Sequence, residues 1–117
     1  MDQNFEHIQT GRLEDIAGGD KEFLNEIISI FLAQIPDFIS KMKTALSNED
    51  WVVLAREAHT AKSSVLTFGM EETGVLLKKI QLTAQSGDYD PLPKMVDQAS
   101  GQMEAAIPDL QQFQSSL

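Results

Sequence analysis

Apolar residues recur at helical intervals through the middle of the chain, and this spacing constrains the fold more than any other feature. Between residues 51 and 68 they follow one another at intervals of four, three, four and three, at Leu54, Ala58, Ala61, Val65 and Phe68. Such spacing aligns the side chains along one narrow stripe of an α-helix, as in a helix that faces a bundle core. Few segments alternate apolar and polar residues as strands do, so we predict an all-α fold.

Glycines, prolines and capping residues divide the chain into five predicted helices. Gly18 and Gly19 end the first helix, Asp20 caps the second, and Pro91 begins the last. Pro36 lies inside the second helix, where we expect a bend or a restart. The predicted helices span residues 5–17, 20–46, 47–68, 71–86 and 91–117. Short connections favour an antiparallel four-helix bundle with an additional short N-terminal helix, and the 117 residues suit a single domain, 1–117.

The second predicted helix is apolar over more of its surface than one core contact needs. Its apolar side chains cover about half of the helix circumference; they are Phe23, Leu24, Ile27, Ile28, Ile30, Phe31, Leu32, Ile35, Phe38, Ile39 and Met42. Neighbouring helices bury all of this surface, or part of it stays exposed as a docking patch. We expect docking contacts near the functional site from Phe31, Ile35 and Phe38.

Composition excludes several classes of function. The chain has no cysteine, which excludes disulfides, thiolate nucleophiles and sulfur-ligated zinc, and its two histidines form no metal-binding cluster. The net charge of −9 repels nucleic acid and anionic membranes. No apolar run approaches the roughly 20 residues of a membrane span, and the first residues do not resemble a signal peptide. We expect a cytoplasmic protein, either free-standing or excised from a larger kinase.

His59 is the candidate reactive side chain. It points about 140° away from the apolar stripe of its helix, so its ring is expected at the rim or in solvent. Arg56 and Lys62 lie one turn away on either side, and Ser63 shares the same face. Neutral imidazole attacks phosphorus readily, and a nearby ammonium stabilises phosphoryl oxygens and disfavours imidazolium. The spacing alone is more typical of an ordinary solvated helix face.

The segment 58–69 resembles the signature of the histidine phosphotransfer family. That signature is a histidine, a lysine three residues later, small residues next, and a glycine ten residues after the histidine. The positions that match are His59, Lys62, Ser64 and Gly69.

The likeness extends beyond this segment. Residues 13–20 resemble the family's entry into its second helix, Asp50 and Trp51 precede the active helix, and residues 86–88 follow the next one. It therefore covers residues 13–88.

The resemblance implies a phosphoryl carrier and not an enzyme. His59 would accept a phosphoryl group from a receiver-domain aspartate and pass it to another receiver domain, with a hybrid sensor kinase as a further partner. It implies a monomer that needs no cofactor or metal of its own, because magnesium and the acidic pocket belong to the receiver. The site residues that it suggests are His59 as phosphorylated residue, Lys62, Ser63 and Arg56 on the active face, and Ser64 and Gly69 for packing or clearance.

Two positions depart from the family pattern. Ser63 replaces the usual glycine one turn after the histidine, which narrows the partner's approach and also offers a hydroxyl to the phosphoryl oxygens. Ala61 replaces the usual leucine and affects packing only. Ser63 keeps open an alternative in which the bundle docks receivers or kinases without carrying phosphate. The sequence argues against a hydrolytic or metal-dependent enzyme, because it has no cluster of histidine, cysteine and carboxylate ligands.

Three further features have open or structural interpretations. Lys78 and Lys79, with Arg56 and Lys62, form either a local basic patch or scattered solvated lysines. Trp51 is expected to pack against the core. We interpret His7 as a surface or capping residue.

Overall fold

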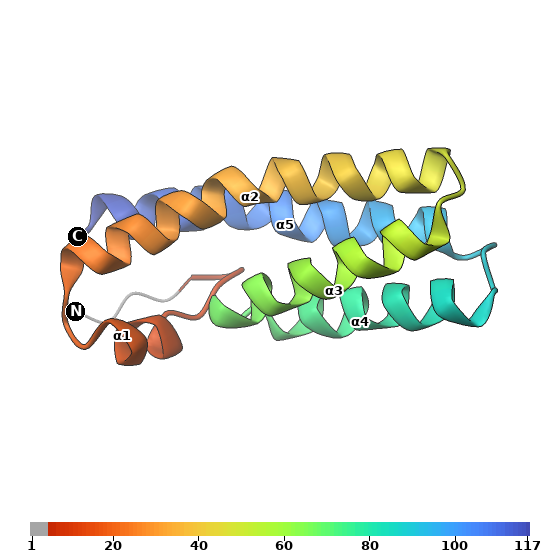
Figure 1. Cartoon of the computed structure of the whole chain (residues 1–117). Coiled ribbons are helices and arrows are strands. Elements are labelled where there is room, and N and C mark those ends of the chain that lie inside the picture. The colour runs from red at the N-terminus through yellow and green to blue at the C-terminus, as the bar shows by residue number, and fades with distance from the viewer. Residues whose placement is uncertain (1–4) are drawn as a thin grey trace.

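The chain forms a bundle of helices, as the sequence predicts. A computed structural model describes residues 5–117, and its helices are α1 (Gly11–Ala17), α2 (Lys21–Ser47), α3 (Trp51–Thr67), α4 (Glu71–Ser86) and α5 (Leu92–Ser115). Helices α2 to α5 run up and down in turn along the 45 Å length of the molecule (Figure 1). α1 lies at the end where α3 and α4 stop short of α2 and α5 (Figure 1). The all-α, antiparallel prediction is confirmed.

Local capping signals set most of the helix ends. The Oδ1 atom of Asp20 accepts a hydrogen bond from the Phe23 N–H at 3.1 Å, and Asp50 does the same for Val53 at 3.2 Å. Each bond satisfies one of the amide groups that the first turn of a helix leaves unpaired. Gly87 ends α4 in the left-handed conformation. The predicted ends of α2 and α4 therefore agree with the structure to within one residue. The third helix, predicted from residue 47, begins only at Trp51, because Asp50 caps it.

Residues 5–10, before α1, form a non-helical segment that we call the strap. The prediction of a helix over residues 5–17 is therefore wrong for residues 5–10. The Gln9 N–H donates to the Phe68 carbonyl at 2.9 Å, and the His7 N–H donates to Asp109 Oδ2 at 2.8 Å. Ile8 lies in the core. Because the amides of the strap bond to distant elements, they are not free for a helical ladder.

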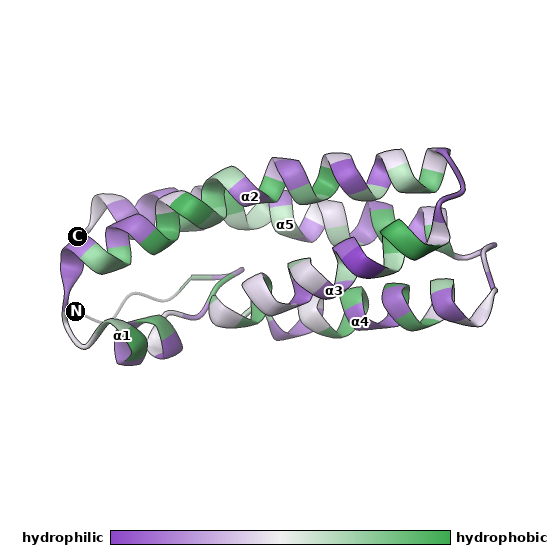
Figure 2. Cartoon of the chain, in the orientation of Figure 1, coloured by the Kyte–Doolittle hydropathy of each residue, from purple (hydrophilic) through white to green (hydrophobic). Residues whose placement is uncertain are grey.

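α2 is continuous through Pro36, which lies on an exposed position of the helix, so the chain does not restart there. Most of its broad apolar surface is covered by neighbouring elements, although Phe23 and Ile30 remain exposed. The buried residues of α2 are Leu24, Ile28, Phe31, Ile35, Phe38, Ile39, Met42 and Ala45. Apolar positions recur along each bundle helix between hydrophilic ones (Figure 2).

α2 also corrects the expectation that no run approaches a membrane span. Among residues 5–117, it is the one helix long and apolar enough to cross a membrane by length and composition, with a mean hydropathy of 1.3. The core helix of a protein that is not in a membrane passes the same test, and 28% of the apolar window of α2 is buried inside the bundle.

Candidate functional site

His59 is exposed on α3. The core stripe of the same helix is fully buried, with Leu54, Ala58, Ala61 and Val65 at 0% exposure. The ring therefore lies on the side of α3 that faces away from the core, as the helical spacing predicts.

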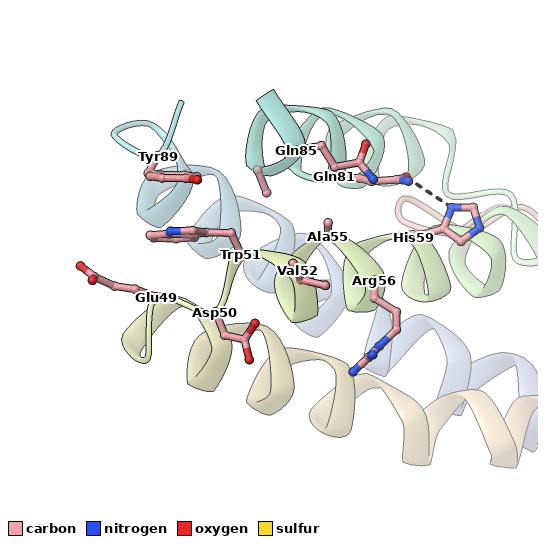
Figure 3. Close-up of a pocket in the computed structure, with 11 residues that line it drawn as sticks. Glu49, Asp50, Trp51, Val52, Ala55, Arg56, His59, Gln81, Gln85 and Tyr89 are labelled. Carbon is pink, nitrogen blue, oxygen red and sulfur yellow. Dashed lines mark hydrogen bonds between the residues drawn. The ribbon is translucent and has the colours of Figure 1, made fainter. Parts of the chain in front are cut away.

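A glutamine from the next helix orients the ring. His59 Nδ1 lies 3.3 Å from Oε1 of Gln81, on α4 (Figure 3). An amide oxygen only accepts hydrogen bonds, so this contact favours the tautomer in which Nδ1 carries the hydrogen and Nε2 holds the lone pair. The free nitrogen lies on the side of the ring opposite Gln81 (Figure 3). Nothing in the sequence pointed to Gln81, because it is 22 positions from His59 and belongs to no motif.

Three contacts define the register between α3 and α4. The first is His59 with Gln81, and the second is Leu66 with Gly74, where an added Cβ would lie 2.6 Å from the leucine Cδ2. The third is the stacked pair Trp51 and Tyr89, just beyond the end of α4. The residue numbers of each pair add up to 140. A residue of α3 therefore lies level with the residue of α4 when their two residue numbers add up to 140.

A hollow opens beside His59 toward the start of α3 (Figure 3). Trp51 and Tyr89 close its far end, with ring centroids 4.0 Å apart and planes 11° from parallel. Trp51 is half-buried and packs against the core, as predicted, but its ring also borders this hollow. The other residues that line it are Glu49, Asp50, Val52, Ala55, Arg56, Gln81, Ala84 and Gln85.

The two predicted cations lie on different sides of His59. Lys62 is half-buried and lies on the helix between His59 and Leu66, which both contact α4, so it is on the α4-facing side of α3. The Arg56 side chain extends toward α2 (Figure 3). The pKa of Lys41, on α2, is raised by its hydrogen bond to Asp37 and by the charges of Asp37 and Glu57, and Arg56 opposes this shift. Arg56 is therefore part of the surroundings of α2, and Lys62 is the cation on the α4 side.

The small residues of the motif have separate surroundings. Ser63 is exposed beside His59, and its carbonyl accepts a hydrogen bond from the Thr67 hydroxyl at 3.2 Å. Ser64 is half-buried. Gly69 follows α3 with a φ of +70°, and a Cβ there would lie 2.5 Å from Gln9 Cβ. The clearance that Gly69 provides is for the strap.

The predicted docking contacts from α2 are wrong. Phe31, Ile35 and Phe38 are 1%, 0% and 4% exposed. Phe31 stacks on Phe68 with ring centroids 4.2 Å apart, inside the core. A helical wheel identifies the apolar side of α2 but not which elements cover it. Near the site, exposed apolar side chains are instead Val52, on α3, Leu82, next to Gln81 in the sequence, and Tyr89 at the end of the hollow.

No group of three or more histidine, aspartate or glutamate side chains in residues 5–117 is arranged to hold a metal ion. The candidate site is therefore one oriented imidazole with a lysine one turn along its helix, open to an approaching protein surface.

One comparison with known proteins identifies a family. The model of the Hpt domain family matches residues 26–113, well over half of the chain. No curated protein matches the chain. The crystal structure of histidine-containing phosphotransfer protein B (HptB) from Pseudomonas aeruginosa PAO1 has the same fold, with a TM-score of 0.89 over 97% of this chain and 99% of that one. The two sequences are 15% identical, so this likeness concerns the fold alone.

Proposed function

This chain belongs to the Hpt domain family, the phosphocarrier domains of phosphorelays, and from that premise we propose that His59 is the residue that carries its phosphoryl group. The observation that supports His59 most directly is its hydrogen bond to Gln81, which occupies Nδ1 and leaves Nε2 free on an exposed face. The other histidine, His7, lies in the strap and pairs loosely with Glu6 at 3.8 Å.

The chemistry requires little beyond positioning. The Nε2 lone pair attacks the phosphorus of an aspartyl phosphate, and an N–P bond forms as the P–O bond to the aspartate breaks. The carboxylate leaves with the bonding electrons, and the ring becomes cationic while Nδ1 keeps its hydrogen on Gln81. Onward transfer to a second aspartate is the same reaction in reverse. Lys62, three residues along α3 from His59, supplies an ammonium that stabilises the charge on the phosphoryl oxygens.

Hpt domains interact with receiver domains in phosphorelays. We propose that two receiver domains, one as donor and one as acceptor, are the direct partners of this chain, with a hybrid sensor kinase upstream. We further propose that residues 1–117 act as one monomeric domain in the cytoplasm. The core supports the single domain, because side chains from all five helices and the strap contribute to it.

The test is direct labelling. The purified chain is mixed with receiver domains of its host that carry ³²P on aspartate, in the presence of magnesium. We expect label to move to the chain and to be stable in base and labile in acid, as a phosphorus–nitrogen bond is. Acid-stable label would indicate a hydroxyl acceptor, and no transfer from any receiver would defeat the proposal.

Ser63 supports the alternative of a docking module that carries no phosphate. Its hydroxyl is exposed on the His59 face, where the family usually has glycine. Receiver binding at wild-type affinity without any transfer of label would favour this alternative over the carrier.

Replacing Gln81 with leucine is expected to slow transfer about two- to tenfold, the effect of one hydrogen bond worth roughly 0.5–1.5 kcal/mol. The reason is that Nδ1 loses its acceptor, so the tautomer with a free Nε2 is no longer favoured. Transfer kinetics and ¹⁵N NMR of the imidazole measure the two effects. Gln85→Leu is the matched control, one turn along α4. Unchanged rates and tautomer populations in Gln81→Leu would remove Gln81 from the mechanism.

A further inference from the structure

The surface around His59 differs in charge from the rest of the molecule. The chain has 18 acidic and nine basic residues. However, residues 58–70 and 73–87, which include most of the facing lengths of α3 and α4, contain no aspartate or glutamate and three lysines. His59 therefore lies in a local window of positive charge on an acidic protein, and an anion approaching the molecule is favoured at this window.

The register between α3 and α4 locates two of these lysines. The residue numbers of Lys62 and Lys78 also add up to 140, as those of His59 and Gln81 do. The two lysines therefore lie level with each other across the interface between α3 and α4. Each is three residues from its neighbour in the His59–Gln81 pair, about 4.5 Å along the helix axis. Around α4, Lys78 is about 60° from Gln81, whereas Lys79 is about 160° away. Lys78 is therefore on the side of α4 next to His59, and Lys79 is not.

Within the described residues, neither of these two lysines has an acidic partner. The ion pairs in residues 5–117 join Lys41 to Asp37 and His7 to Glu6, away from α4. Lys78 is exposed and Lys62 is half-buried. Two free ammonium groups at the same level, on opposite sides of one interface, suit an anion with two negative charges.

Resting on the proposed function, we propose that Lys78 and Lys62 form a two-lysine phosphoryl-binding site on the side of His59 opposite the Trp51–Tyr89 hollow. The Nε2 atom faces away from Gln81, and a phosphoryl group on it would present its oxygens to an open surface (Figure 3). A lysine has a flexible four-carbon stem that spans about one helical turn. In this proposal the Lys78 ammonium binds the transferred phosphoryl group from α4, and the Lys62 ammonium binds it from α3.

The test compares Lys78→Ala with Lys79→Ala, which remove the same charge from neighbouring positions of one helix. Potassium phosphoramidate is the donor, because it transfers a phosphoryl group to imidazole with loss of ammonia and needs no receiver. We expect Lys78→Ala to slow labelling of His59 about three- to fivefold and Lys79→Ala to have little effect. Lys62→Ala is expected to slow labelling similarly without abolishing it. Equal rates for Lys78→Ala and Lys79→Ala would overturn the proposal.

A second measurement does not depend on phosphorylation. Inorganic phosphate is titrated into each unlabelled variant and followed by the NMR shifts of His59, Lys62 and Lys78. We expect Lys78→Ala to raise the Kd for phosphate about threefold or more relative to Lys79→Ala. Phosphate binding that depends on Lys78, in a chain that no donor labels, would retain the lysine site and defeat the proposed function. Normal labelling with equal phosphate binding in both variants would defeat the lysine site alone.

Discussion

Replacing His59 with glutamine is expected to abolish phosphoryl transfer to the chain and to leave the bundle folded. Glutamine keeps a polar side chain of similar length but has no nitrogen lone pair that attacks phosphorus. His59 is exposed, and within residues 5–117 its ring makes one hydrogen bond, to Gln81. The free energy of unfolding should therefore change by no more than that one hydrogen bond, about 1 kcal/mol. Labelling by a phosphorylated receiver and thermal unfolding measure the two effects.

His7→Gln is the matched control for this variant. It removes the other histidine, from a strap whose backbone N–H bonds to Asp109, and labelling should stay at the wild-type level. Titration with an unphosphorylated receiver separates chemistry from docking, since His59→Gln should still bind. Retained acid-labile label in His59→Gln would show that another nitrogen carries the phosphoryl group.

Local signals made most of the helix boundaries predictable. Asp20 caps the first turn of α2, and Gly87 takes up the left-handed conformation that ends α4, both as predicted. The start of α3 was less exact, since residues 47–50 offer several capping side chains and Asp50 is the one that caps. The strap was not predictable in this way. Its shape depends on hydrogen bonds to Phe68 and Asp109, which lie far along the chain, and no local pattern reports such partners.

The functional site was predictable wherever one helix suffices to define it. The spacing within α3 determines that His59 faces away from the core and that Lys62 lies one turn along. Gln81 and the level of Lys78 depend on how α3 and α4 slide past each other, and only the packed structure fixes that register. The prediction that Phe31 is a docking contact was wrong for the same reason. A helical wheel does not show which neighbouring helices bury the apolar side of α2.

Replacing Gly69 with alanine is expected to destabilise the fold by about 2–4 kcal/mol and to lower Tm by about 10 °C. One part of the cost is the φ of +70°, a conformation that disfavours any residue with a Cβ. The other part is steric, because the new Cβ would lie 2.5 Å from Gln9 Cβ and 2.8 Å from the Gln9 carbonyl oxygen. The strap must move, which weakens its bond to Phe68 and the burial of Ile8.

Two other glycines separate these contributions. Gly87 has a φ of +84°, but an added Cβ would meet only the Tyr89 hydroxyl, at 4.0 Å, so Gly87→Ala measures the conformational cost of about 1 kcal/mol. Gly101 lies inside α5 with nothing within 4 Å, and Gly101→Ala should stabilise the fold by about 0.5–1 kcal/mol. If Gly69→Ala costs no more than Gly87→Ala in chemical denaturation, the strap moves aside freely. Because Gly69 is ten residues from His59, folded Gly69→Ala should carry phosphate at the wild-type rate, which separates the role of this glycine in the fold from the chemistry of the histidine.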